Sequence, residues 1–302
     1  MKILLAVDGS KYSEAAAGFL GFLDLSEKDE ITVFHALDMG RLLRNKAAFQ
    51  STLKEIKNLF EPGIFAPVLE ILKPVKAKVC TAVIEGPAKQ VIVEKAAEAG
   101  MDLIVMGARG TKGVESVLLG SVSRTVSIQS PVPVLVAKTP LNVKRGGLRI
   151  LFATDGSAYS SATCELLAFM PFPQNCRLTV LNVIRPVTWD FPITIVPEIN
   201  EQFAGIIRDA REKEKQESAR ILAEARQKLE NRFSEVEVAT VEGDASGEIL
   251  AGAEGMKADL VAVGCRGLTG LKGMIGSVSR NVLHHSKCAV LIGKFCIASV
   301  KC

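Results

Sequence analysis

Two stretches decide the fold: KILLAVDGSKYSEAA at residues 2–16 and RILFATDGSAYSSAT at residues 149–163. Each begins with an apolar run of strand length, turns at Asp-Gly-Ser and continues with a helical pattern rich in Ala and Ser. Aligning them places Asp8 on Asp155 at an offset of 147 residues, and the same offset places ITVFHAL on LTVLNVI. The chain therefore contains an internal repeat.

Two later blocks extend this repeat. Residues 84–110 align with 241–267 at an offset of 157, and residues 120–138 align with 276–294 at an offset of 156. Because the blocks keep their order in both copies, they indicate a duplication and not a shared composition. We predict two domains, at 1–140 and 148–295, that are joined by a linker containing Pro and Gly.

Short apolar runs alternate with longer helical patterns within each copy, which is typical of βαβ units and a parallel sheet. The apolar runs are almost continuous in Val, Ile and Leu, as expected of strands covered by helices on both faces. We predict an α/β fold of two tandem doubly wound, Rossmann-like domains, each with a five-stranded parallel sheet. The predicted strands are 2–7, 31–37, 77–84, 102–106, 132–137, 149–154, 177–184, 235–241, 259–263 and 288–293.

The predicted helices include Ser13–Leu23, Pro87–Ala99 and a long charged helix at Glu201–Asn231. The last replaces a shorter helical segment around 45–60 in the first copy. We expect the copies to diverge most here, between their second and third strands, because peripheral connections vary more than the elements they join.

Composition narrows the classes of partner. The 302-residue chain has a net charge of +4, but its basic residues lie beside acidic ones and form no block, which argues against nucleic acid. The seven cysteines form no CxxC pair, as expected in a reducing cytoplasm. No apolar run reaches the roughly 20 residues that a membrane-spanning helix requires, so we predict a cytoplasmic protein without membrane contact.

Asp8 and Asp155 follow the first strand of their copies, at the edge where ligands of doubly wound sheets bind. A carboxylate there can accept a hydrogen bond from the amino group of a base or from a ribose hydroxyl. It can equally form an Asx turn or cap the next helix. The residues alone leave these two roles open.

Glycines follow the fourth strand directly. In the first copy nine residues separate Gly107 and Gly110 from Gly120 and Ser121, counted from Gly110 to Gly120. Glycines let backbone N–H groups approach a phosphate, and the N-terminus of the next helix adds donors and the positive end of its dipole. This loop is suited to a polyphosphate, although a glycine-rich loop can also be only a turn.

The chain resembles the universal stress protein family, whose ATP-binding members carry G-x2-G-x9-G-(S/T) at this place. The resemblance also covers the aspartate after the first strand, the EG-x-A segments and the GSVS runs, and so nearly the whole chain. It implies an adenine nucleotide alpha-hydrolase-like fold and an adenine nucleotide ligand: ATP, or AMP or ADP, with Mg²⁺. It assigns cofactor binding in the first copy to Asp8, Ala36, Gly107, Gly110, Gly120, Ser121 and Val122.

The second copy departs from the pattern at one point. Its matching positions are Asp155, Val183, Gly264, Gly267, Gly276, Ser277 and Val278. Only eight residues separate Gly267 from Gly276, and one deleted residue can shift backbone donors by up to about 3.5 Å. Nucleotide binding is therefore less secure in the second domain than in the first.

Three functions follow from these observations. A nucleotide-responsive regulator is favoured, since the resemblance implies binding and no GxxxxGK[ST], HRD or DFG motif marks a dedicated phosphoryl-transfer enzyme. Slow ATP hydrolysis, and a scaffold that works without nucleotide, are the alternatives. Arg109 and Arg266 are either phosphate contacts or solvated loop residues, and His35 is expected to be a core histidine with its hydrogen bonds satisfied.

Members of this family typically dimerise through the last strand, so the resemblance implies an internal pseudo-dimer in which strands 132–137 and 288–293 lie side by side. Such pairing covers two otherwise open sheet edges. A further homodimer and a protein partner are both compatible with the sequence, which identifies neither.

Overall fold

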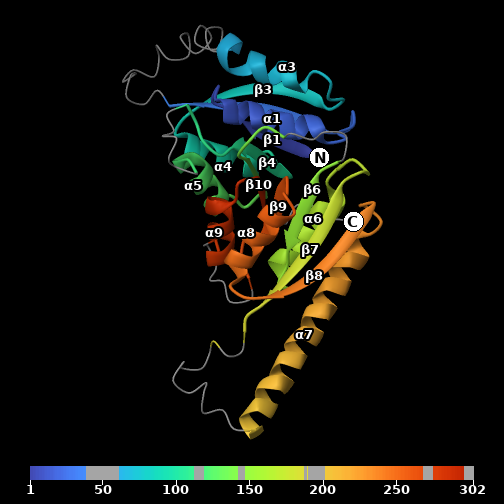
Figure 1. Cartoon of the computed structure of the whole chain (residues 1–302). Coiled ribbons are helices and arrows are strands. Elements are labelled where there is room, and N and C mark those ends of the chain that lie inside the picture. The colour runs from blue at the N-terminus through green and yellow to red at the C-terminus, as the bar shows by residue number, and fades with distance from the viewer. Residues whose placement is uncertain are drawn as a thin grey trace.

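The computed structural model of the chain describes residues 1–38, 61–111, 119–141, 147–186, 189, 201–267 and 275–295. They form one ten-stranded sheet in the order β3-β2-β1-β4-β5-β10-β9-β6-β7-β8 (Figure 1). Each half is parallel, and the halves join through the antiparallel pair β5–β10, in which Leu135 lies opposite Leu291. This confirms the predicted fold class and the pairing of the two last strands.

All ten predicted strands are present, with ends that differ by at most two residues. They are β1 (Lys2–Ala6), β2 (Glu30–Leu37), β3 (Lys78–Glu85), β4 (Leu103–Gly107), β5 (Val134–Ala137), β6 (Arg149–Ala153), β7 (Arg177–Ile184), β8 (Glu235–Glu242), β9 (Leu260–Gly264) and β10 (Ala289–Gly293). The agreement arises because strands buried on both faces have apolar runs that end where the chain leaves the sheet.

Helices fill the connections between the strands. In the described part of the chain they are α1 (Lys11–Phe22), α3 (Ala66–Leu72), α4 (Ala88–Glu98), α5 (Ser121–Gln129), α6 (Ala158–Phe169), α7 (Glu201–Leu229), α8 (Ala245–Gly255) and α9 (Ser277–His285). A short π-helical segment, Glu61–Phe65, leads into α3. The segment predicted around 45–60 lies outside the described residues, and α9 continues through His284 and His285.

Two cores lie on the two faces of the sheet. Because successive side chains of a strand point to opposite faces, Ile3 and Leu5 of β1 join one core while Leu4 and Ala6 join the other. The first core packs against α1, α3, α6 and α7, and the second against α4, α5, α8 and α9. Each core is continuous across both repeats, as the single sheet in Figure 1 requires.

The turn after the first strand is built alike in both copies. Gly9 and Gly156 have φ values of +78° and +73°, a backbone conformation that glycine adopts without strain. Ser10 and Ser157 then cap α1 and α6, where their hydroxyls accept from the N–H groups of Ser13 and Ser160. The repeated Asp-Gly-Ser is therefore a strand-to-helix turn in both domains.

Each domain also places one buried lysine against the last helix of the other domain. Lys138, just after β5, donates to the carbonyls of His284 and Ser286 at the end of α9, at 3.5 and 2.5 Å. The equivalent Lys294, just after β10, donates to the carbonyl of Ile128 in α5 at 3.2 Å. Because a cation near a helix C-terminus satisfies unpaired carbonyls and the dipole, each domain caps the last helix of the other.

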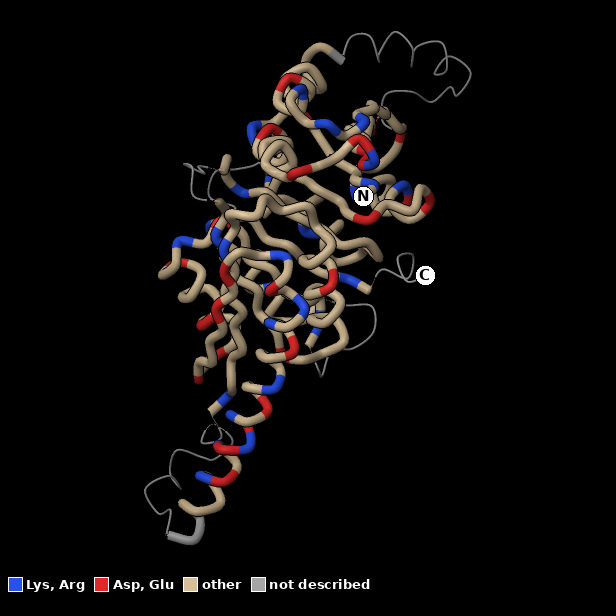
Figure 2. Tube along the Cα trace, turned by 90° about the vertical axis from the view of Figure 1, so that its right-hand side faces the viewer, with Lys and Arg blue, Asp and Glu red and all other residues tan. Residues whose placement is uncertain are grey.

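The long helix α7 runs along β7 and β8 and extends beyond the sheet (Figure 1). Its Lys and Arg residues alternate with Asp and Glu (Figure 2), as in the pairs of Arg220 with Glu217 and Glu224. None of the helices that the structure describes combines the length and the apolar content needed to cross a bilayer.

Candidate functional site

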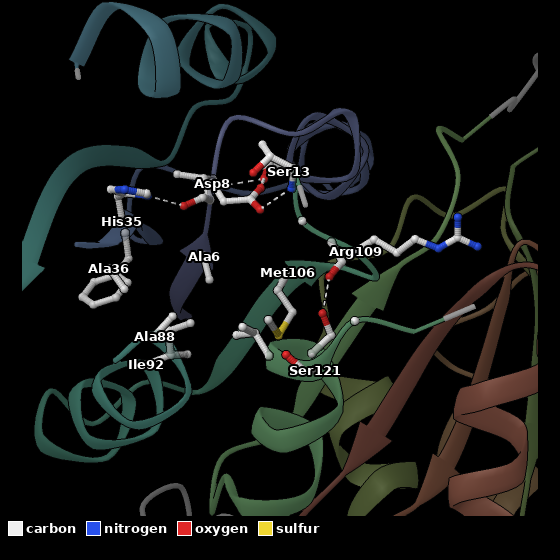
Figure 3. A pocket seen from close by; sticks show the side chains of 18 residues that line it. Ala6, Asp8, Ser13, His35, Ala36, Ala88, Ile92, Met106, Arg109 and Ser121 are labelled. Carbon is white, nitrogen blue, oxygen red and sulfur yellow. Dashed lines mark hydrogen bonds between the residues drawn. The ribbon is translucent and has the colours of Figure 1, made fainter. Parts of the chain in front are cut away.

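A cavity of about 370 Å³ opens at the carboxyl ends of β1, β2 and β4 in the first domain (Figure 3). It contains all seven residues that we predicted for this copy, together with others from the same elements. Its lining is Ala6, Val7, Asp8, Ser13, Phe34, His35, Ala36, Ala88, Ile92, Met106, Gly107, Arg109, Gly110, Thr111, Gly120, Ser121, Val122 and Ser123. The fold brings together side chains that lie more than a hundred residues apart.

One end of this cavity is apolar. Ala36 of β2 and Met106 of β4 lie on either side of Ala6 of β1 (Figure 3). Ala88 and Ile92 of α4 lie beside them. The small side chains of Ala36 and Ala88 leave room for a flat group, and larger neighbours supply apolar contact. This end is suited to an aromatic base.

The opposite end is bounded by glycine backbone. A Cβ atom on Gly110 would lie 2.3 Å from Oδ2 of Asp8, and one on Gly107 would lie 2.6 Å from the backbone of Tyr12. A Cβ atom on Gly120 would lie 3.2 Å from the carbonyl of Ala108. A Cβ atom on Gly107 would overlap backbone atoms, so glycine is required there. At Gly110 the Asp8 carboxylate would have to move, and at Gly120 the contact would be tight.

Asp8 fastens this loop to the first strand. Its Oδ1 accepts from the N–H of Ser10 at 3.1 Å and from the hydroxyl of Ser13 at 2.7 Å. Its Oδ2 accepts from the N–H of Thr111 at 3.1 Å. The contact with Ser10 is the Asx turn that we left open, while the helix cap is Ser10 itself. A carboxylate offers about four acceptor positions, so these three donors leave one unused.

Helix α5 begins at the glycine loop and points its N-terminus at the cavity. Gly120 precedes its first residue, Ser121, and both line the cavity with Val122. Ser123 donates to the carbonyl of Gly107 at 2.7 Å, which ties the helix to the end of β4. The unpaired N–H groups of the first turn and the positive end of the dipole therefore lie where an anion can use them.

His35 differs from our expectation. Its Nδ1 lies 2.8 Å from the carbonyl of Val7, as in a core histidine whose hydrogen bonds are satisfied. However, the side chain is only partly buried and lines the cavity beside Ala36 (Figure 3). Its ring meets the ring of Phe65, just before α3, edge-on at 6.5 Å between centroids, so an element distant in the sequence decides how far His35 is buried.

Arg109 lines the cavity and makes a contact that we had not considered. Its Nη1 donates to the hydroxyl of Tyr12 at 3.0 Å, and its guanidinium lies 5.4 Å from the centre of that ring. Figure 3 shows the guanidinium directed away from the apolar end of the cavity. Arg266 repeats this contact with Tyr159, at 2.8 and 5.1 Å. The loop arginines therefore stack on the helix that follows the first strand.

The second domain repeats much of the loop geometry. A Cβ atom on Gly267 would lie 2.6 Å from Oδ2 of Asp155, and Ser279 donates to the carbonyl of Gly264 at 2.6 Å. Gly276 precedes Ser277, the first residue of α9, and Val278 follows. Most of the shortened loop, residues 268–274, lies outside the described residues, so its consequence for nucleotide binding stays a prediction.

Two substitutions distinguish the second crevice. Asn182 stands where the first copy has His35, and it donates to the carbonyl of Thr154 at 2.7 Å as His35 contacts Val7. Val183 stands where the first copy has Ala36. Because Val adds two methyl groups, this position offers less room for a base in the second domain.

Sequence reasoning missed several lining residues, chiefly Phe34, Ile92, Met106 and Thr111. The first three belong to elements that we had predicted, but apolar side chains of core elements carry no local signal of a cavity; Thr111 lies in the glycine loop. Ala88 had a usable signal, since it belongs to the EG-x-A segment that the resemblance rested on. Within the part of the chain that the structure describes, no group of three His, Cys, Asp or Glu residues is placed to hold a metal ion.

Comparisons with known proteins agree with this architecture. Universal stress protein YxiE of Bacillus subtilis is 33% identical over 146 residues, which are 48% of this chain and 97% of that protein. The crystal structure of a universal stress protein from Archaeoglobus fulgidus covers 97% of this chain and 96% of its own, with a TM-score of 0.61 and 24% identity. A second solved protein, a putative universal stress protein from Pseudomonas aeruginosa, covers 97% of this chain and 92% of its own with a TM-score of 0.54 and 18% identity.

The family model agrees with both repeats. The model of the "Universal stress protein family" matches residues 1–138 and, a second time, residues 148–294. The two matches together span nearly all of the chain, and they coincide with the two halves of the ten-stranded sheet. The chain belongs to the universal stress protein family, as a tandem of two of its domains.

Proposed function

We propose that the chain is an adenine-nucleotide-binding regulator whose first domain holds the nucleotide, and that it is not a dedicated catalyst. The observation that carries this proposal is the 370 Å³ cavity, which joins an apolar end to a glycine loop at the N-terminus of α5. Its volume falls within the ~300–1,000 Å³ of typical ligand pockets.

The residues present fit such a ligand. Ala36, Ala88 and Ile92 would contact the base, and the open acceptor position of Asp8 would receive a ribose hydroxyl or an amino group. The backbone of Gly110 and Gly120 would approach the phosphates, which α5 would hold through its first N–H groups. Bound Mg²⁺ would neutralise phosphate charge. Because the same Asp8 oxygens hold the loop, nucleotide binding and loop order are coupled.

The polar groups of the cavity support binding more than catalysis. Asp8 is engaged with three donors of the protein, and Ser13, its hydroxyl partner, is only 2% exposed. His35 contacts a backbone carbonyl. A regulator needs no nucleophile or base; it needs only different affinities of the bound and empty states for a partner.

The test is the nucleotide content of the purified full chain, released by acid and quantified by chromatography. We expect about one adenine nucleotide per chain, since the first cavity is the better formed. Gly120→Asp places a carboxylate in the loop and should remove it, because like charges repel the phosphates.

Gly276→Asp is the matched control, since it makes the same change in the second domain. We expect it to keep the nucleotide of the first domain. Absence of nucleotide, with no thermal shift on added ATP and Mg²⁺, would overturn the proposal and favour a scaffold. Steady release of ADP by the wild type, lost in Gly120→Asp, would instead support the slow ATPase.

A further inference from the structure

A second cavity, of about 200 Å³, lies between the two domains on the face of the sheet covered by α5 and α9. Its described lining comes from both copies and consists of Leu119, Arg124, Ile128, Ile275, Arg280, Asn281, Leu283 and His284. Arg124 and Arg280 are equivalent in the repeat, since each is the fourth residue of its helix. The cavity is therefore bounded by the same helix of each domain (Figure 1).

The charge of this lining is one-sided. It carries two guanidinium groups and an imidazole, and none of its described residues carries a carboxylate. Arg280 donates a long hydrogen bond of 3.5 Å to the carbonyl of Ile275, and within the described residues neither arginine forms an ion pair. Other arginines of the described chain do pair with carboxylates, as in Arg149–Asp259, Arg177–Glu235 and Arg220–Glu217.

Neighbouring groups add to the positive potential. The ammonium of Lys138 lies directly behind the end of α9, bonded to the carbonyls of His284 and Ser286. Burial lowers the pKa of His284 below its ordinary value, and the charges of His285, Lys138 and Arg124 lower it further. The field at this cavity therefore disfavours another positive charge and favours an anion.

We propose that this cavity binds a small phosphate-type anion, of the size of phosphate or pyrophosphate, between Arg124 and Arg280. The planar guanidinium group binds phosphate oxygens in pairs, which makes arginine the usual residue for such recognition. The cavity, at about 200 Å³, is smaller than the cavity of about 370 Å³ that we assign to a nucleotide, so a small anion suits it better.

The position of the site gives it a consequence for the glycine loops. Leu119 and Ile275 line it, and each directly precedes the Gly-Ser that opens the next helix. An anion held there would contact the ends of both loops at once and would bind the two domains to each other. This inference does not depend on nucleotide binding in the first domain.

The test is titration of the full chain with inorganic pyrophosphate by isothermal calorimetry, at a constant ionic strength so that screening does not change. We expect one saturable site in the wild type. Arg124→Gln and Arg280→Gln should each weaken it roughly tenfold or more, the loss of a charge-assisted pair of hydrogen bonds. Arg→Lys at either position, which keeps the charge and loses the fork, should weaken it less.

Two further variants locate the site. Arg177→Gln removes an exposed arginine elsewhere and should leave the pyrophosphate affinity unchanged. Gly110→Ala impairs the glycine loop of the first domain without adding charge beside the cavity, and it should also leave a saturable site. Pyrophosphate binding that survives in Arg124→Gln/Arg280→Gln, or that disappears in Gly110→Ala alone, would place the anion on the glycine loop and overturn the proposal. Absence of saturable binding in the wild type would overturn it as well.

Discussion

The two domains of this chain share a sheet, a turn and a glycine loop, yet their crevices differ at the positions that a base would touch. In the first, Ala36 and His35 end β2, and a cavity of about 370 Å³ reaches from them to Gly120. In the second, Val183 and Asn182 take those places, and the loop is one residue shorter. Duplication preserved the contacts that hold the loop, such as Ser279 on Gly264, while the contacts available to a ligand changed.

The difference shows which parts of the motif are structural. Both aspartates lie against a loop glycine, and both loop arginines stack on a tyrosine, although the second loop breaks the spacing of the first. Those features therefore belong to the architecture of the turn. At the end of the second strand, Ala36 and Val183 carry no polar group that could hold the turn, and their size affects whether a base fits.

The largest effect is expected from Gly110→Ala. A Cβ atom 2.3 Å from Oδ2 of Asp8 forces the loop away from the carboxylate and breaks its bond to Thr111. A hydrogen bond to a charged group contributes ~1.5–3 kcal/mol, and the backbone N–H groups that would bind the phosphates would move as well. We therefore expect adenine nucleotide affinity to fall roughly a hundredfold. Calorimetric titration with ATP and Mg²⁺ measures it.

Gly267→Ala is the matched variant for that experiment. Its Cβ atom would lie 2.6 Å from Asp155, so the structural insult is similar. We expect the tight site to persist, because that site lies in the first domain. Equal losses in the two variants would mean that both crevices bind nucleotide and that the shorter loop is harmless.

The next effect concerns Lys138 and Lys294, the lysines that contact the opposite domain, and it depends on pH. Burial lowers the pKa of Lys138 from 10.5 to about 8, since the ammonium loses its hydration. The unfolded chain therefore binds more protons between these values, so stability rises with pH over this range. Relative to Lys138→Met, the wild type should gain up to about 3 kcal/mol in free energy of unfolding as the pH rises from about 8 to 10.5.

Lys294→Met tests whether the second domain behaves alike. The pKa of Lys294 is also lowered by burial, so the change with pH has the same sign. Denaturant unfolding of the wild type and of the two variants across this pH range measures the contribution of each lysine to the free energy of unfolding. A pH-independent difference for Lys138→Met would show that its amine is hydrated in the folded protein.

A smaller effect is expected from exchanging the residues at the end of the second strand. Ala36→Val should weaken adenine nucleotide binding by about tenfold, since a methyl or methylene group in a closed pocket changes binding by ~1–3 kcal/mol. Val183→Ala should improve binding to the second domain in a Gly120→Asp background. Fluorescence titration with a labelled nucleotide measures both. Unchanged affinity in Ala36→Val would exclude this end of the cavity as the base site.

The smallest effect concerns the stacked arginines. Tyr12→Phe removes the hydroxyl that accepts from Arg109, and Tyr159→Phe removes the one that accepts from Arg266. Since the ring contact remains, each should lower the free energy of unfolding by about 0.5–1.5 kcal/mol. Denaturant unfolding measures it. A loss confined to one of the two variants would show that the arginines are not equivalent.

The parts of this fold that could be predicted are those with a local signal. Buried parallel strands carry apolar runs, so all ten were located, and Gly107, Gly110 and Gly120 marked the loop that lines the cavity. Three features could not be predicted: the partial exposure of His35, the stacking of Arg109 on Tyr12 and the helix Ala66–Leu72. Each depends on which distant element covers the position, and this information does not lie in the neighbouring residues.

The repeat, the positions of the strands along the chain and the Asp-Gly-Ser turn follow from local sequence, because periodicity and glycine restrict the backbone residue by residue. Tertiary structure decided the rest. It placed Lys138 at the end of α9, and it set Arg124 and Arg280 on either side of one cavity. Pairing β5 with β10 joined the two cores, and contacts between domains exist only once that pairing has formed.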